Sequence, residues 1–426
     1  MSNKTTPPLR GTPPAEGNDS PSPKGWQAKP DGVVPKLRFP AFREADGWVV
    51  KRLCEVADVS ASGDLDSENF SPAKTEDHTY PIYSNSVTQE GLYGYCAYPK
   101  FQKNSVTITA RGTLGVAFYR DHDYVGIGRL LVLSKLNNIE PYFLQEIWNY
   151  SAKMPLENGG IPQLTAIKAR ETELWIPEKE EQQKIADCLA SLDERITLEA
   201  QKLDTLKTHK KGLMQQLFPA GGETLPKLRF PEFRDAGEWE KKQLKDACEM
   251  QAGKFVQASD IQERQNGDLY PCFGGNGLRG YTKTFTHEGT YSLIGRQGAL
   301  CGNINLASGR FHATEHAVVA TPKAGVDNNW LFHKLTLLNL NQYATGQAQP
   351  GLSIENIERI EINIPRDIGE QQKIADCLSS LDDLITAQTQ QLAALKTHKK
   401  GLMQQLFPSV GGVPHRGGVV EVAGEA

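Results

Sequence analysis

Residue patterns that signal catalysis are sparse in this sequence of 426 residues. It has no G-x-x-x-x-G-K-[ST] phosphate loop, no G-x-G-x-x-G that opens a helix, and no G-x-S-x-G nucleophile elbow. It also lacks the Asn-Pro-Pro-aromatic run that amino-methyltransferases use. These absences predict a scaffold or a reader of other molecules, without catalytic residues of its own.

Histidines and cysteines give no convincing metal site either. His312 and His316 are spaced as in a zinc protease, but the Glu that should follow the first His is missing. Packing or contact with a base is therefore favoured over metal binding. The 7 cysteines contain no C-x-x-C pair, and we expect reduced, packed thiols.

Composition and charge narrow the class of protein. Hydrophobic residues make up 38% and charged residues 23%, enough for the cores of about two to four domains. A net charge of −4 argues against a free-standing, non-specific binder of nucleic acid, which needs excess Lys and Arg. No long apolar run and no apolar leader are present, so we expect a cytoplasmic protein without a membrane partner.

A duplication organises the chain. The segment 34–43 returns as 225–234, and 181–219 returns as 370–408 with 30 of 39 positions identical. Between these near-identical blocks lie two dissimilar stretches, 48–177 and 239–365. The sequence therefore predicts two copies of one module, each with a variable and a fixed part.

The fixed blocks are predicted to form long coiled-coil helices. Apolar residues recur in steps of four and three, with polar interruptions at Glu199 and Lys210 and, in the second copy, Gln388 and Lys399. We expect the two helices to bury their seams against each other, although a helix from another chain is an alternative. The predicted seam residues are Ile185, Leu189, Leu192, Ile196, Leu203, Leu206, Ile374, Leu378, Leu381, Ile385, Leu392 and Leu395.

The variable stretches combine short strand-like runs, such as 105–110 and 317–320, with helical segments near 143–148 and 330–338. We predict an α+β fold: two mixed domains separated by two long antiparallel helices, with an internal pseudo-two-fold repeat. The predicted parts are a disordered tail 1–32, domain 1 (33–177), helix 178–219, domain 2 (220–365), helix 366–408 and a disordered tail 409–426.

The order of these blocks resembles the specificity subunit of type I restriction-modification systems. Three motifs carry the resemblance. They are the motif Lys-Leu-Arg-Phe-Pro that opens each module (the opener), Pro177 and Pro365 each followed by Glu-Gln-Gln-Lys-Ile-Ala, and the motif Lys-Thr-His-Lys-Lys-Gly-Leu-Met-Gln-Gln-Leu-Phe that closes each fixed block (the closer). Each motif alone is a weak signal, but their duplicated order covers roughly 33–408 and is specific.

The resemblance implies that each variable domain is a target-recognition domain that reads one half of a split site on double-stranded DNA. It further implies that the helices hold the domains apart and dock two methyltransferase (modification) subunits. Restriction and translocase subunits would join them. S-adenosylmethionine, ATP and Mg would be bound in those partner subunits, and this chain would bind no cofactor and catalyse nothing.

The resemblance also indicates a Gly-bearing turn with Arg after an apolar strand as a DNA contact. The segments 108–115 and 293–299 fit this description, and two further polar turns accompany each of them. Arg favours guanine, and Asn or Gln favours adenine. The candidate DNA-binding residues are Asn85, Arg111, Gly112, Thr113, Gln163, Asn276, Arg296, Gln297, Gln347 and Gln349.

Other interpretations stay open at this point. The chain could be a coiled-coil interaction scaffold that no longer reads DNA, or the specificity partner of a fused nuclease-methyltransferase. Each candidate turn could also be purely structural, because Gly, Asn and Pro are common turn residues. The basic pairs Lys210-Lys211 and Lys399-Lys400 are expected to lie on a solvated helix face.

Overall fold

A computed structural model describes residues 32–151, 163–298, 300–346 and 350–408. The chain divides into two compact units: 1–192 together with 398–426, and 193–397. The long helices α4 (Lys179–Leu217) and α8 (Ile368–Leu406) have 39 residues each, and each contributes to both units. The mixed α+β fold and the two long helices confirm the predicted fold class.

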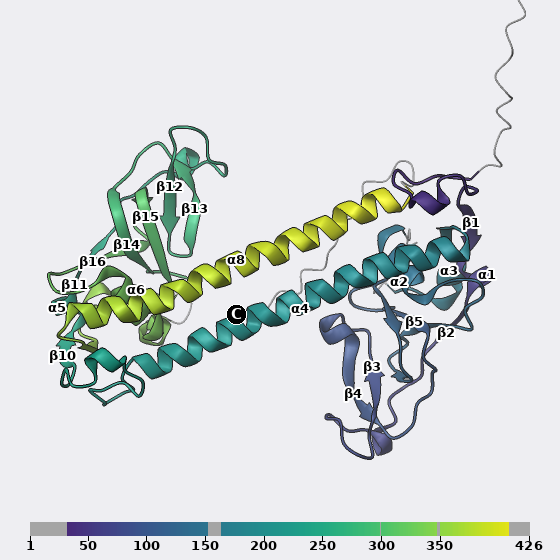
Figure 1. Cartoon of the computed structure of the whole chain (residues 1–426), viewed down its shortest axis with the longest axis horizontal. Helices are drawn as coiled ribbons and strands as arrows, with labels where there is room; N and C mark the ends of the chain where they lie inside the picture. Colours follow the sequence, from purple (N-terminus) through teal and green to yellow (C-terminus); the bar gives the residue numbers. More distant parts are fainter. Residues whose placement is uncertain (1–31, 152–162, 299, 347–349, 409–426) are drawn as a thin grey trace, which may run out of the picture. The chain divides into compact units, whose positions relative to one another are not determined.

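Domain 1 lies in the first unit and contains small sheets (Figure 1). One has the order β2-β8-β5-β6, and another the order β4-β3-β7. Strands β1 and β9 form an antiparallel pair, and helix α2 (Pro141–Ser151) packs against β5 and β6. The strands are β1 (Val49–Arg52), β2 (Asp58–Ala61), β3 (Tyr80–Tyr83), β4 (Leu92–Cys96), β5 (Ser105–Ile108), β6 (Ala117–Arg120), β7 (Val125–Gly126), β8 (Leu131–Ser134) and β9 (Glu173–Ile176).

Domain 2 lies in the second unit and repeats this topology with one difference. Its strands join into one sheet with the order β11-β16-β14-β15-β12-β13, because the single strand β15 takes the places of β6 and β7. In domain 1 the segment 121–123 interrupts the equivalent strand. The strands are β10 (Glu240–Gln243), β11 (Cys248–Ala252), β12 (Tyr270–Gly274), β13 (Gly277–Thr282), β14 (His287–Gly295), β15 (Ile304–Ala313), β16 (Ala317–Pro322) and β17 (Glu361–Ile364).

Each domain core includes the beginning of one long helix and the end of the other. In the first unit, Ile185 and Leu189 of α4 join the core, and so does Phe407 at the end of α8. The Phe407 ring lies 6.2 Å from that of Trp48 and 6.0 Å from that of Phe143, between centroids. The apolar closer of the fixed block is therefore a core segment.

The second unit has the equivalent arrangement. Phe218, just after α4, lies with its ring centroid 6.2 Å from Trp239 and 5.8 Å from Trp330. Ile374 and Leu378 at the start of α8 belong to the same core. The prediction that the helices bury their seams against each other is thus incomplete, because both ends of each seam enter a domain core.

The repeated opener and the Glu-Gln-Gln motif meet in a buried clamp. In the first unit, Arg38 forms a two-pronged ion pair with Glu181, at 2.8 and 2.6 Å. Gln182 follows and accepts a hydrogen bond from Glu140 N at 2.8 Å while its amide donates to Pro177 O at 2.9 Å. These motifs recur because they fix the start of the helix to its domain.

Within the second unit, α4 and α8 also contact each other directly (Figure 1). Gln388 is 4% exposed, and its amide donates to the carboxylate of Glu199 at 2.6 Å. Lys210 Nζ lies 2.5 Å from Asp382 Oδ1. Three of the four polar positions predicted for the seam, Glu199, Gln388 and Lys210, therefore pair with each other or with an acid on the facing helix.

His333 on helix α6 (Asn328–Leu337) makes this junction sensitive to acid. Its ring is fully buried beside Ser379, and burial lowers its pKa to about 4. In the unfolded state His333 takes up a proton near pH 6.5, whereas in the folded state it does so only near pH 4. The folded state is therefore stabilised above pH 6.5 and loses this stability as the pH falls toward 4. Between pH 7 and pH 5, the unfolding free energy of the natural protein should fall by about 2 kcal/mol more than that of the His333→Leu variant. Urea titrations at several pH values test this, and parallel profiles would contradict it.

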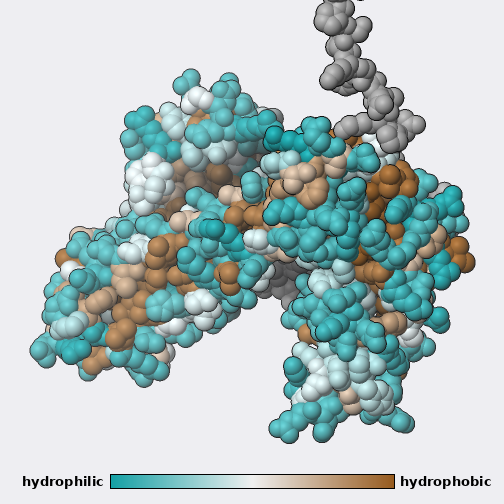
Figure 2. Space-filling model, turned by 45° about the vertical axis from the view of Figure 1, so that its right-hand side comes forward, coloured by the Kyte–Doolittle hydropathy of each residue, from teal (hydrophilic) through white to brown (hydrophobic). Residues whose placement is uncertain are grey.

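The molecular surface is largely hydrophilic on the face drawn in Figure 2, with apolar side chains in smaller groups. Several large apolar residues are exposed, among them Ile167 and Phe255. Within the described part of the chain, we find no helix that has both the length and the apolar character needed to cross a membrane.

Candidate functional site

In domain 1, three segments that are distant in sequence meet at Ala110, the residue before Arg111. The Asn85 side chain reaches across from the turn after β3, and its Oδ1 accepts a hydrogen bond from Ala110 N at 2.7 Å. Leu164 N donates to Ala110 O at 3.0 Å. Because Gln163 directly precedes Leu164, the structure brings three of the predicted DNA-binding residues to one place.

In domain 2, the corresponding segments meet at Arg296. Its N–H donates to His316 O at 2.9 Å, and its carbonyl accepts from Leu352 N at 2.9 Å. The turn after β12 approaches so closely that a Cβ on Gly295 would stand 2.2 Å from Gly275 O. This close approach of the two segments requires glycine at residue 295.

A pocket of about 520 Å³ opens between the hairpin turn of β12 and β13 and the loop after β14. Residues 274–277 line it, and its polar side chains are those of Asn276, Arg279, Gln297 and His316. All four can form hydrogen bonds to base edges or phosphates. The pocket joins two predicted DNA-binding residues, Asn276 and Gln297, to Arg279, which the sequence did not single out, and to His316, which the sequence marked for packing or contact with a base.

The predicted site residues differ in how accessible they are. Arg111, Gly112, Thr113, Asn276 and Gln297 are exposed, and Asn85, Gln163 and Arg296 are half-buried. Asn85 has both ends of its amide engaged, since Nδ2 also donates to Gly128 O at 2.6 Å. It therefore positions the loop that carries Arg111. Gln347 and Gln349 lie outside the described residues.

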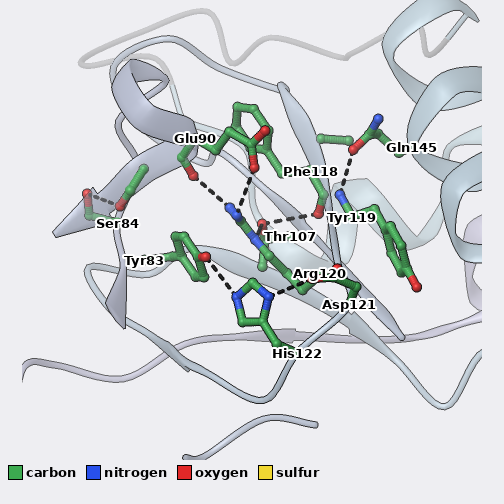
Figure 3. A network of polar contacts seen from close by, with 12 residues as sticks. Tyr83, Ser84, Glu90, Thr107, Phe118, Tyr119, Arg120, Asp121, His122 and Gln145 are labelled. Atoms are coloured by element: carbon green, nitrogen blue, oxygen red, sulfur yellow. Dashed lines mark hydrogen bonds and ion pairs between the residues drawn. The ribbon is translucent and has the colours of Figure 1, made fainter. Parts of the chain in front are cut away.

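A buried arginine, Arg120, joins side chains from neighbouring strands of domain 1 (Figure 3). The guanidinium of Arg120 lies 3.5 Å from the centroid of the Tyr83 ring, donates to Thr107 Oγ1 at 3.0 Å and donates to Glu90 O at 2.7 Å. Burial lowers the pKa of Arg120 and raises that of Tyr83. These contacts connect β3, β5 and β6 and so hold the candidate loop on a rigid base.

Tyr83 and His122 also form part of an open cavity of about 680 Å³ in domain 1. The Tyr83 hydroxyl lies 2.8 Å from His122 Nε2, and His122 Nδ1 lies 2.6 Å from Asp121 Oδ1 (Figure 3). Lys74 and Lys103 line the same cavity. It is polar and carries charges of both signs.

Two basic residues, Arg129 and His316, stand at equivalent positions of the two domains and are missing from the candidate DNA-binding residues named from the sequence. The parallel pairs Ile82–Val125 in domain 1 and Cys272–His312 in domain 2 fix the same register in both domains. Counting four residues onward from the second partner of each pair reaches Arg129 and His316. Without the strand register the two residues could not be matched, because one is arginine and the other histidine.

The His312–His316 pair is not arranged as a metal site. His312 Nδ1 lies 3.0 Å from Thr284 Oγ1, and Nε2 lies 3.0 Å from Lys254 O. Both ring nitrogens thus have partners within the domain, which agrees with the predicted packing role for this residue. His316 instead lines the pocket of domain 2. In the part of the chain that the structure describes, we find no cluster of ligands suited to a metal ion.

All twelve predicted seam residues are buried or half-buried. The expectation of a solvated face is correct for the exposed Lys211 and Lys400 and wrong for their neighbours. Lys210 pairs with Asp382 at 2.5 Å, and Lys399 Nζ lies 3.0 Å from Glu146 Oε2, whose side chain is 5% exposed. Both lysines therefore hold structural contacts.

Comparison with known proteins gives a consistent result. The family model of the type I restriction modification DNA specificity domain matches residues 45–208 and again 236–397. The specificity subunit of the EcoprrI type I restriction enzyme of Escherichia coli is 45% identical over 164 residues, which are 38% of this chain and 40% of that protein. The chain thus matches less than half of the length of this relative.

Two further relatives match over a longer span. The putative MjaX specificity subunit of Methanocaldococcus jannaschii is 24% identical over 66% of this chain and 71% of its own length. The crystal structure of the type I restriction-modification S subunit of M. genitalium covers 88% of this chain and 100% of that chain, with a TM-score of 0.67 and 16% identity. At this identity the structural likeness shows the fold.

Proposed function

Since this chain belongs to the family of type I restriction-modification DNA specificity domains, we propose that it reads a split DNA sequence, one half with each domain. Domain 1 would read one half-site and domain 2 the other. The long helices would set the gap between the half-sites and dock the modification subunits. No part of this role requires a catalytic residue in the chain itself.

The observation that carries the proposal is the repeated geometry of the candidate site. In each domain the same three segments meet just after the first strand of a hairpin, at Ala110 in one domain and at Arg296 in the other. The frame is shared, but the exposed residues on it differ. One scaffold with two different polar surfaces is what two different half-sites require.

The partner assignments rest on the family. Two modification subunits would supply the adenine methyltransferase site with S-adenosylmethionine, and restriction subunits would supply ATP- and Mg-dependent translocation and cleavage. The net charge of −4 supports a shared DNA interface, because docked partners can provide many of the phosphate contacts.

The test is co-expression with the modification subunit of the same restriction-modification system, in a host without other adenine methylases. Sequencing of methylated adenines should show two short blocks separated by a gap of fixed length. As a control for modularity, exchanging 48–177 for the first domain of another family member should change one block and leave the other intact.

A stable complex that methylates nothing would overturn the DNA-reading role in favour of a scaffold. A change of both blocks after the exchange of one domain would contradict the assignment of one half-site to each domain.

A further inference from the structure

Two hairpins carry the candidate loops, and their strand registers match the loops residue by residue. In domain 1, Ile108 of β5 pairs with Ala117 of β6. In domain 2, Ile294 of β14 pairs with Ile304 of β15. These last pairs before each loop make Ile108 and Ile294 equivalent, and the loop of domain 2 is one residue longer.

Backbone hydrogen bonds inside the loops confirm this equivalence for the next residue. Thr109 N donates to Val116 O at 3.0 Å, and Gly295 N donates to Asn303 O at 2.8 Å. The carbonyls of the same two residues, Thr109 and Gly295, each accept a bond of 2.7 Å from a glycine with positive φ near the end of the loop. Thr109 and Gly295 are therefore equivalent.

The third segment of each site fixes the following residue. Leu164 N donates to Ala110 O at 3.0 Å, and Leu352 N donates to Arg296 O at 2.9 Å. Ala110 is thus the counterpart of Arg296. It follows that Arg111 matches Gln297, and that both precede a glycine with positive φ, 68° at Gly112 and 89° at Gly298. The segments 108–115 and 293–299 are counterparts as expected, but Arg111 and Arg296 are not at equivalent positions.

Arg296 occupies a position that suits a residue holding the loop in place better than a residue reading bases. Its counterpart Ala110 is only 3% exposed, and the backbone of Arg296 is bonded on both sides, to His316 and Leu352. The next position, by contrast, is exposed in both domains. A side chain at this position extends from a loop that backbone hydrogen bonds and a glycine turn hold in place, so it is well positioned to read bases.

We infer that Arg111 and Gln297 are the equivalent specificity-determining residues of the two domains, and that they read corresponding base pairs of the two half-sites. The inference rests on the proposed function. The Arg111 guanidinium matches the O6 and N7 acceptors of guanine, and the Gln297 amide matches the N7 acceptor and N6 donor of adenine. One module position therefore selects guanine in one half-site and adenine in the other.

The experiment uses the full chain in its complex with the modification subunit, with the methylated motif as readout. Arg111→Gln should lower the preference for guanine at one position of the domain 1 block by about 10-fold or more and admit adenine there, leaving the other block unchanged. Gln297→Arg should make the reverse change in the domain 2 block only. Arg43→Gln, which removes an exposed arginine of the same unit, is the charge-matched control and should change neither block.

The outcomes separate this inference from the proposed function. If the natural chain yields no split motif, the proposed function fails. If it yields one and Arg111→Gln leaves the motif unchanged, only the inference is overturned. A uniform loss of methylation with unchanged base preference would assign Arg111 to a phosphate and would also overturn it. Arg111→Ala provides a second variant, which should lose the guanine preference without gaining adenine.

Discussion

Replacing Phe407 by alanine should strongly destabilise domain 1, although this residue stands beyond the end of the second long helix. Phe407 is 1% exposed and packs among Trp48, Phe143 and Tyr150 in the core of the first unit. Removing a buried phenylalanine ring costs about 3–5 kcal/mol, which is a large part of the stability of a single domain. The free energy of unfolding of the first unit should fall by that amount.

Segment-resolved hydrogen exchange of the full chain provides the measurement. In Phe407→Ala, amides of β5 and β8 should exchange faster, while those of β14 and β16 keep their protection. Phe218→Ala is the matched variant, because Phe218 packs between Trp239 and Trp330 in the second unit. It should show the opposite pattern. Equal acceleration in both domains by either variant would contradict two separate cores.

The sequence alone predicts much of this architecture because duplication makes it visible. Fixed and variable blocks alternate, and the four-three spacing of apolar residues identifies α4 and α8 as long helices. Spacing does not reveal what an apolar position packs against. Ile185 and Phe407 could therefore not be assigned to the core of domain 1 before the fold was known.

From the sequence, the segments that form the candidate site could be identified, but not which residue of one domain corresponds to which residue of the other. Glycines and polar residues mark the turns, and the structure does bring those turns together. The loop after β14 is one residue longer than the loop after β5, and Asn85 of one domain corresponds in strand register to Gly275 of the other. Aligning similar letters therefore pairs Arg111 with Arg296, whereas the backbone bonds pair it with Gln297.

The basic residues of the helices show the same limit. Lys210 and Lys211 are neighbours of identical type, and the four-three spacing alone separates them, because it places Lys210 in the seam and Lys211 beside it. In the structure, Lys210 meets Asp382, and Lys211 is exposed. The spacing does not identify the acid that pairs with Lys210, because that acid lies on a distant segment.

The clamp at the start of each helix gives the second large effect that we expect. Arg38 and Glu181 are 4% and 1% exposed, and the carboxylate raises the pKa of Arg38 through a two-pronged hydrogen bond. Arg38→Met leaves Glu181 charged and buried without its partner, which costs about 3–5 kcal/mol. Adding Glu181→Met to Arg38→Met should recover most of that loss, because no unpaired charge then remains.

The second copy of the clamp supplies a matched comparison. Arg229 and Glu370 form the same ion pair, at 2.7 Å for both contacts, but Trp239 Nε1 also donates to Glu370 at 3.2 Å. Arg229→Met therefore leaves Glu370 with one donor and should cost less than Arg38→Met. The equivalent Trp48 Nε1 is buried and forms no hydrogen bond with any described residue.

Chemical denaturation of the natural protein and the three variants at pH 7 tests this account. Arg38→Met should unfold at a clearly lower denaturant concentration than the natural protein, and the double variant at nearly the natural concentration. If Arg38→Met and Arg229→Met lost the same stability, the tryptophan donor would make no difference. If the double variant recovered none of the loss, the clamp would act only through packing.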